Sequence, residues 1–179
     1  MTVTVVTASL PERTARLAEA CASVAAQTVP PVAHLVGIDH ARNGPERIRN
    51  ALVAAAGSEW VAFLDDDDVL YPHHVERLLA ASADIDVVYP YCDVAGRGGW
   101  SPNQGFDASA LRQYNFIPVT ALVRRSSFLA VGGFSEQTHP VEDWHLWRRM
   151  LDDGARFRCV PERTWLYRFG ADNATLIGR

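Results

Sequence analysis

Trp60-Val-Ala-Phe-Leu-Asp-Asp-Asp-Asp68 joins an uncharged run rich in β-forming residues to four consecutive carboxylates. Residues 60–64 have the character of a strand that is buried on both faces, as the strands of parallel sheets are. Such a strand delivers the residues after it to the carboxyl edge of the sheet, where open α/β folds bind their ligands. The sequence therefore places residues 65–68 at a candidate ligand site.

The four aspartates of this run repel one another unless water screens them, some of them are protonated, or a cation binds. In an extended chain Asp65 and Asp67 point to the same side, where they could hold a hard divalent ion through oxygen atoms. The alternative is a solvated acidic turn before a helix that starts at Pro72. The buried strand directly before the acids favours the metal site.

The composition favours a globular domain that does not bind nucleic acid. The chain has 179 residues, 48% of them apolar, and a formal net charge of −4. It can therefore bury a sizeable core, and it lacks a basic surface for nucleic acid or an anionic membrane. All 17 basic residues are arginines, which excludes a P-loop lysine and a Schiff-base lysine.

The three cysteines, Cys21, Cys92 and Cys159, are odd in number and far apart, which favours free thiols over disulfides or a zinc site. The sequence shows no signal-peptide pattern and no apolar run of about 18 residues. We therefore expect no transmembrane segment and a cytoplasmic location.

The order of the expected elements indicates an α/β fold. Strands over residues 3–6, 34–38 and 60–64 alternate with two helices, which are expected to begin at the capping patterns Ser9…Glu12 and Asn43…Glu46. This β-α-β-α-β order favours a Rossmann-like, mostly parallel central sheet with helices on both faces.

The second half of the chain has shorter expected elements. Strands are predicted over residues 86–91, 119–123, 157–160 and 165–169, with a helix over residues 142–151. The glycine-rich residues 95–105 predict a loop. No repeat or linker interrupts the chain, so we expect a single domain over residues 1–179.

The second expected helix carries an apolar stripe and an arginine that could bind phosphate. The stripe predicted to be buried consists of Ile48, Ala51, Leu52, Ala55 and Ala56. Arg49 lies beside this stripe. Its guanidinium could pair with phosphate oxygens, and the alternative is a solvated helix face.

Two further acidic positions stand where ligands could reach them. Asp39 comes directly after the second strand and could accept hydrogen bonds from a nucleobase or ribose, or it could be a simple turn residue. Glu142 and Asp143 begin a helix, where acids favour the helix dipole, but one of them could also act as a general base. The other is then expected to cap the helix or to pair with an arginine, for which Arg124 and Arg125 are candidates.

Six short motifs succeed one another along residues 3–168: Val3-Thr-Val-Val-Thr7, Ser23-Val-Ala-Ala-Gln-Thr28, Arg49-Asn50, Phe63-Leu-Asp-Asp-Asp-Asp68 with Pro72, Gly132-Gly-Phe134 and Glu142-Asp-Trp-His-Leu-Trp147. In this order and spacing they resemble the family 2 glycosyltransferases of the GT-A fold. The resemblance implies inverting transfer of a sugar from a nucleoside-diphosphate-sugar donor to an acceptor hydroxyl, with a divalent metal, Mn²⁺ or Mg²⁺. The acceptor could be a glycan, a lipid-linked compound or a small molecule, and an oligomer is compatible with the sequence.

The resemblance also implies roles for residues on the donor side. Asp67 matches the acid that holds the metal on the diphosphate, and Asp65 matches the acid near the ribose. Asp39 matches the acid that contacts the base, and Arg49 matches an arginine near the nucleotide. Asp66 is grouped with these donor-binding residues. The donor is then expected to bind the nucleotide-binding half, about residues 1–92.

On the acceptor side, about residues 93–179, the resemblance makes Asp143 the catalytic base. Glu142, Trp144 and Arg168 are possible acceptor or supporting residues. Many family members have a histidine after a Tyr-Arg pair near the end, whereas this chain continues Tyr167-Arg-Phe-Gly170. That contact with the metal or diphosphate is therefore either missing or supplied by Arg168.

Two other functions are compatible with parts of this pattern. One is a non-catalytic module of the same fold that binds nucleotide-sugars, although such a module would be expected to lose the base or the metal acid. The other is a phosphohydrolase that uses Asp65-x-Asp67, but this class normally needs a downstream lysine and the chain has none.

Overall fold

The computed structural model describes residues 1–96, 103–138 and 140–169. Its elements, in chain order, are β1 (Val3–Ser9), α1 (Thr14–Ala25), β2 (Ala33–Ile38), α2 (Pro45–Ala55), β3 (Trp60–Phe63), β4 (Val69–Leu70), α3 (His74–Ala80), β5 (Val87–Gly96), α4 (Ala108–Leu111), β6 (Leu122–Arg124), α5 (Arg125–Ala130), α6 (Glu142–Asp152) and β7 (Phe157–Phe169).

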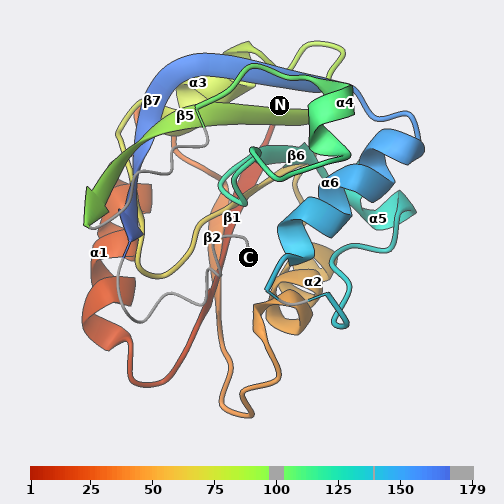
Figure 1. The fold of residues 1–179 in the computed structure, drawn as a ribbon. Helices are drawn as coiled ribbons and strands as arrows, with labels where there is room; N and C mark the ends of the chain where they lie inside the picture. The colour runs from red at the N-terminus through yellow and green to blue at the C-terminus, as the bar shows by residue number, and fades with distance from the viewer. Residues whose placement is uncertain (97–102, 139, 170–179) are drawn as a thin grey trace.

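The strands form one mostly parallel sheet, as predicted. Its order is β2-β1-β3-β6-β5-β7-β4. Strand β1 pairs in parallel with β2 and with β3, and β5 pairs in parallel with β7. Strand β6 runs antiparallel between β3 and β5, and the short β4 runs antiparallel on the outer edge of β7. The long β5 and β7 curve together across one side of the molecule (Figure 1).

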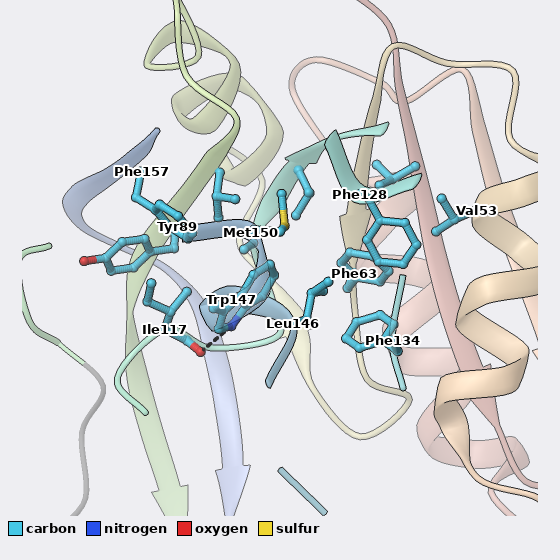
Figure 2. Packing of buried hydrophobic residues seen from close by; sticks show 14 of the residues in the cluster. Val53, Phe63, Tyr89, Ile117, Phe128, Phe134, Leu146, Trp147, Met150 and Phe157 are labelled. Atoms are coloured by element: carbon cyan, nitrogen blue, oxygen red, sulfur yellow. Dashed lines mark hydrogen bonds between the residues drawn. The ribbon is translucent and has the colours of Figure 1, made fainter. Parts of the chain in front are cut away.

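Helices cover both faces of the sheet because β3 is apolar on both sides. Every residue of β3 is at most 1% exposed. Trp60 and Ala62 pack in a core with residues of α1 and α3, whereas Val61 and Phe63 pack in a second core with α2, α5 and α6. Figure 1 shows α1 on the opposite side of the sheet from α2, α5 and α6, and Figure 2 shows Phe63 beside Phe128 in the second core.

Both predicted capping patterns are wrong. Helix α1 begins at Thr14, with Arg13 at the N-cap, and Ser9 is the last residue of β1. Helix α2 has Gly44 at its N-cap, where φ is +101°. The Gly44 N–H donates to Asp39 Oδ2 at 2.9 Å. An acceptor from the end of β2 therefore replaces the local cap that the sequence pattern predicted.

The buried stripe of α2 is rotated from the predicted one. Glu46, Arg49, Val53 and Ala56 are buried, whereas Ala51 and Ala55 are exposed. Arg49 therefore belongs to the buried face, because its guanidinium pairs with the carboxylates of Asp65 and Glu142. Apolar periodicity cannot reveal a stripe that contains a buried ion pair.

The C-terminal strands also differ from the prediction. Strand β7 is continuous over residues 157–169 instead of forming two strands. Its pairing with β5 passes from Val160 directly to Arg163, so two residues, including Pro161, bulge out of register. A proline is tolerated at such a bulge because it lacks an N–H to donate.

Strand β5 continues to Gly96, past the predicted end of that strand. Residues 95 and 96 of the expected loop thus belong to a strand, while residues 97–102 lie outside the described residues. Strand β6 begins at Leu122, later than predicted.

The three cysteines are free. The longest described helix, α1, has 12 residues, and no helix in the described part of the chain has the length and hydropathy of a membrane span.

Candidate active site

The acid run lies in a tight turn just beyond β3. The backbone N–H of Asp68 donates to the carbonyl oxygen of Asp65 at 3.2 Å, so the chain turns here instead of continuing as an extended strand. One carboxylate oxygen from each of Asp65, Asp67 and Asp68 lies within 4.8 Å of the other two. We call these three residues the acid cluster. Asp65 and Asp67 approach each other as expected, and the turn adds Asp68.

Asp66 points away from the acid cluster. Its Oδ2 accepts a hydrogen bond from Ser9 Oγ at 2.5 Å, and its Oδ1 accepts one from Arg13 Nη1 at 2.7 Å. The same Arg13 nitrogen lies 3.4 Å from Asp67 Oδ2. Asp66 is thus tied to the carboxyl end of β1 and the start of α1, and Arg13 links it to the acid cluster.

The acid cluster has the properties of a divalent-metal site. Burial and the charge of Asp65 raise the pKa of Asp67 to about 6, and the same causes raise the pKa of Asp68 well above its ordinary value. Both shifts reflect buried negative charge that a cation would stabilise. Three carboxylate oxygens are the hard donors that Mn²⁺ and Mg²⁺ take, so these residues fit the expected metal.

Arg168 reaches the acid cluster through its backbone. Its N–H donates to Asp68 Oδ1 at 2.8 Å. Its guanidinium instead pairs with Glu19 of α1 at 2.6 Å. The side chain that was a candidate contact for the diphosphate is therefore directed to α1 in this structure.

Arg49 connects the acid cluster to the start of α6. It is 5% exposed, and it donates to Asp65 Oδ1 at 2.5 Å and to Glu142 Oε1 at 2.9 Å. Glu142 thus pairs with an arginine, as one of the two expected alternatives had it, but the candidate partners Arg124 and Arg125 are wrong. Arg124 pairs with Glu59 and donates to the carbonyl oxygen of Ile85. Arg125 donates to two carbonyl oxygens near the end of α2. The Arg49–Glu142 pair spans 93 residues of sequence, so no local pattern could have indicated it.

Asp143 comes after Glu142 in the first turn of α6 and is held at both carboxylate oxygens. Oδ1 accepts the Trp144 N–H at 2.7 Å, and Oδ2 accepts an N–H of Asn115 at 2.9 Å. Burial and the neighbouring Glu142 carboxylate raise the pKa of Asp143 to about 7, against these hydrogen bonds. A carboxyl group with a pKa near neutrality suits general-base chemistry.

Asp39 lies at the same sheet edge as the acid run. It is 6% exposed, and its N–H donates to the carbonyl oxygen of Ser9 at 2.8 Å. Ser9 in turn binds Asp66. The carboxyl ends of the parallel strands β2, β1 and β3 thus bring these three residues together, as the strand-end rule requires. The predicted contact of Asp39 with a nucleobase stays a prediction.

Residues 7–132 match the family described as Glycosyl transferase family 2. The chain belongs to this family. The matched region contains Arg49 and the acid cluster and ends before α6, so Glu142 and Asp143 lie outside it and their roles stay predictions.

Two relatives of this chain carry the names Pre-mycofactocin glycosyltransferase and Succinoglycan biosynthesis protein ExoO. The Pre-mycofactocin glycosyltransferase of Mycobacterium tuberculosis (strain CDC 1551 / Oshkosh) is 33% identical over 135 residues, 66% of this chain and 28% of the relative. The Succinoglycan biosynthesis protein ExoO of Rhizobium meliloti (strain 1021) is 31% identical over 97 residues, 53% of this chain. The chain spans 28% of the length of each.

Solved structures of Staphylococcus aureus TarS show the same fold. TarS 1–349 in complex with UDP-GlcNAc aligns with a TM-score of 0.79 and 16% identity, covering 97% of this chain and 60% of that chain. TarS 1–349 in complex with UDP aligns with a TM-score of 0.74 and 16% identity, covering 95% and 61%. The likeness confirms the GT-A fold, a mixed α/β architecture with a mostly parallel sheet.

The Arg-Asn and Gly-Gly-Phe motifs meet beneath the site. Asn50 donates to the carbonyl oxygen of Phe134 and accepts its N–H, at 2.8 and 2.9 Å. The Phe134 ring in turn lies under the Arg49 guanidinium, and Arg49 Cζ is 5.4 Å from the centre of the ring. Gly133 has φ +69°, and a Cβ there would lie 2.5 Å from Asn50 Oδ1. These motifs therefore fix the backbone and ring that support Arg49.

Ser9, Arg13 and Asn115 are site residues that the sequence did not indicate. Ser9 and Arg13 lie at or just beyond the end of β1, at the carboxyl edge of the sheet, so the strand-end rule could have located them. Asn115 offers no comparable signal, because it lies between α4 and β6 and meets Asp143 only through the tertiary structure. Trp144, a predicted acceptor or supporting residue, is partly buried and donates its indole N–H to the Leu111 carbonyl oxygen.

Proposed function

We propose that this chain is a catalytic domain that transfers a sugar from a nucleoside-diphosphate-sugar to an acceptor hydroxyl, with inversion at the anomeric carbon and with Mn²⁺ or Mg²⁺ bound. The Arg49 bridge carries the proposal, because one buried guanidinium pairs with Asp65 and with Glu142. The donor half, about residues 1–92, thereby meets the half that bears Asp143, about residues 93–179.

On the donor side, Asp67 would hold the metal together with Asp65 and Asp68. When bound, the metal supplies positive charge that stabilises the leaving nucleoside diphosphate. Asp39 would accept a hydrogen bond from the nucleobase, and Asp66 would support the donor site through Arg13. Structures of TarS, a protein of the same fold, hold UDP-GlcNAc and UDP, which supports a nucleotide-sugar as the donor class.

On the acceptor side, Asp143 would remove the proton of the acceptor hydroxyl as that oxygen attacks the anomeric carbon. Its pKa of about 7 allows the carboxylate both to exist and to accept a proton near neutral pH. Glu142 is held by Arg49 and would act as a support. The acceptor is a compound with a free hydroxyl, on a glycan, a lipid-linked carrier or a small molecule.

The test is a screen of nucleotide-sugars for metal-dependent binding and for release of the nucleoside diphosphate. We expect binding with Mn²⁺ or Mg²⁺ that weakens when a chelator is added, together with slow turnover. Asp67→Ala should lose the metal-assisted part of binding, whereas Asp143→Asn should keep binding and lose turnover by roughly 10²-fold or more. Binding by the wild-type chain with no turnover of any donor would instead identify a non-catalytic binding module.

A further inference from the structure

Asn115 contacts Asp143 directly, and its amide can face only one way. Its Nδ2 donates to Asp143 Oδ2 at 2.9 Å, and its Oδ1 accepts the Ile117 N–H at 3.2 Å. A backbone N–H can only donate, so the Asn115 carbonyl must face Ile117 and the NH₂ group must face the carboxylate. The structure thus gives Asp143 a hydrogen-bond donor in a fixed orientation.

The segment that carries Asn115 is fastened to α6 on both sides of this residue. The Trp144 indole N–H donates to the Leu111 carbonyl oxygen at 2.6 Å, and the Trp147 indole N–H donates to the Ile117 carbonyl oxygen at 3.1 Å. Figure 2 shows the second of these bonds. Leu111 and Ile117 are fully buried. Two anchors in the core therefore set the distance between Asn115 and Asp143.

These contacts hold the Asp143 carboxylate without occupying all of its hydrogen-bond acceptor positions. Oδ1 accepts the Trp144 N–H and Oδ2 accepts the Asn115 N–H. Each carboxylate oxygen has two lone pairs, so each keeps one acceptor position for a hydroxyl proton. The plane of the carboxylate is fixed while its basic positions stay available.

We propose that Asn115 is a positioning residue that orients the Asp143 carboxylate toward the acceptor hydroxyl and keeps it deprotonated. This inference rests on the proposed role of Asp143 as the base. The charged groups that act on Asp143 are Glu142 on its own helix and Arg49 on α2. On the side of α4, Arg112 pairs with Asp152 at the far end of α6. Asn115 supplies a neutral donor, which favours the charged form of a carboxylate.

The inference is tested with Asn115→Asp, which keeps the shape and removes the NH₂ donor, and with Asn115→Ala. Gln113→Ala is the matched control, since Gln113 is exposed on the same segment. The titration of the Asp143 carboxyl is followed by carbon-13 NMR and assigned by its loss in Asp143→Asn. We expect its midpoint to rise by about one pH unit in Asn115→Ala and further in Asn115→Asp, while Gln113→Ala leaves it unchanged.

The same variants are tested in transfer. A rise of about one pH unit from a pKa of about 7 lowers the deprotonated fraction at pH 7 by about 5-fold. We therefore expect about 5-fold lower kcat/KM at pH 7, recovery toward wild type near pH 9, and unchanged donor affinity. An unmoved titration in both Asn115 variants would overturn the inference whether or not the chain transfers sugar. If Asp143→Asn transfers sugar at the wild-type rate, the proposed base fails, and the positioning role fails with it.

Discussion

The Asp143 carboxylate should make the folded protein less stable above neutral pH, and Asp143→Asn should relieve this cost. Burial and Glu142 raise its pKa from 3.8 to about 7. A carboxyl group with a raised pKa in the folded state carries no penalty below its unfolded value. The penalty grows as the pH rises from about 4 and is fully present above about 7. The wild-type chain should therefore lose stability from this group over that window.

The magnitude comes from the size of the shift. About three pH units correspond to about 4 kcal/mol, and partial exposure of Asp143 to solvent reduces this figure. In Asp143→Asn, the new NH₂ group must face either the Trp144 N–H or the Asn115 amide, which costs about 1 kcal/mol. We expect Asp143→Asn to be more stable than wild type by about 2 kcal/mol at pH 8. For a domain of this size, such a gain raises Tm by roughly 4–8 °C.

The assay is urea and thermal unfolding of both proteins from pH 4.5 to pH 8. Asp153→Asn serves as the control, because Asp153 is exposed at the other end of the same helix. The difference between Asp143→Asn and wild type should grow with pH, whereas Asp153→Asn should behave as wild type does. If Asp143→Asn is the less stable protein at pH 8, its surroundings stabilise ionised Asp143, which contradicts the raised pKa.

The site geometry gives three further expected outcomes. Glu142→Gln leaves Arg49 with one carboxylate partner and should lower the free energy of unfolding by about 1–3 kcal/mol while costing less transfer than Asp143→Asn; unchanged urea midpoints would contradict the bridge. Gly133→Ala places a Cβ at φ +69° against Asn50 and Phe128 and should destabilise by about 2–4 kcal/mol. Gly132→Ala, at φ +80° with open space, should cost only about 1 kcal/mol; equal losses in unfolding experiments would show that the contact is unimportant. The kcat/KM of the wild-type enzyme should rise with pH through a pKa of about 7, and a profile that is flat from pH 5 to pH 9 would remove Asp143 as the base.

The sequence alone determined the central strand and the acids at its end. Residues 60–64 have no charge and are rich in β-forming residues, which predicted a strand buried on both faces and therefore central in the sheet. The acids are joined directly to this strand in the chain, so the position of the acid cluster at the sheet edge was predictable. The same local logic located Asp39 after β2 and placed Glu142 and Asp143 in the first turn of a helix.

The tertiary structure decided which partner each charged group has. Arg49 meets Glu142 across 93 residues, and Asn115 meets Asp143 across 28. These pairs depend on how α2, α6 and the segment before β6 pack on the sheet, and helical or strand periodicity contains no information about that. The buried arginine in α2 and the bulged continuation of β7 have the same origin. Asp65 and Glu142 pair with an arginine that local rules would place in water, and pairing with β5 on both sides of the bulge continues β7 past Pro161.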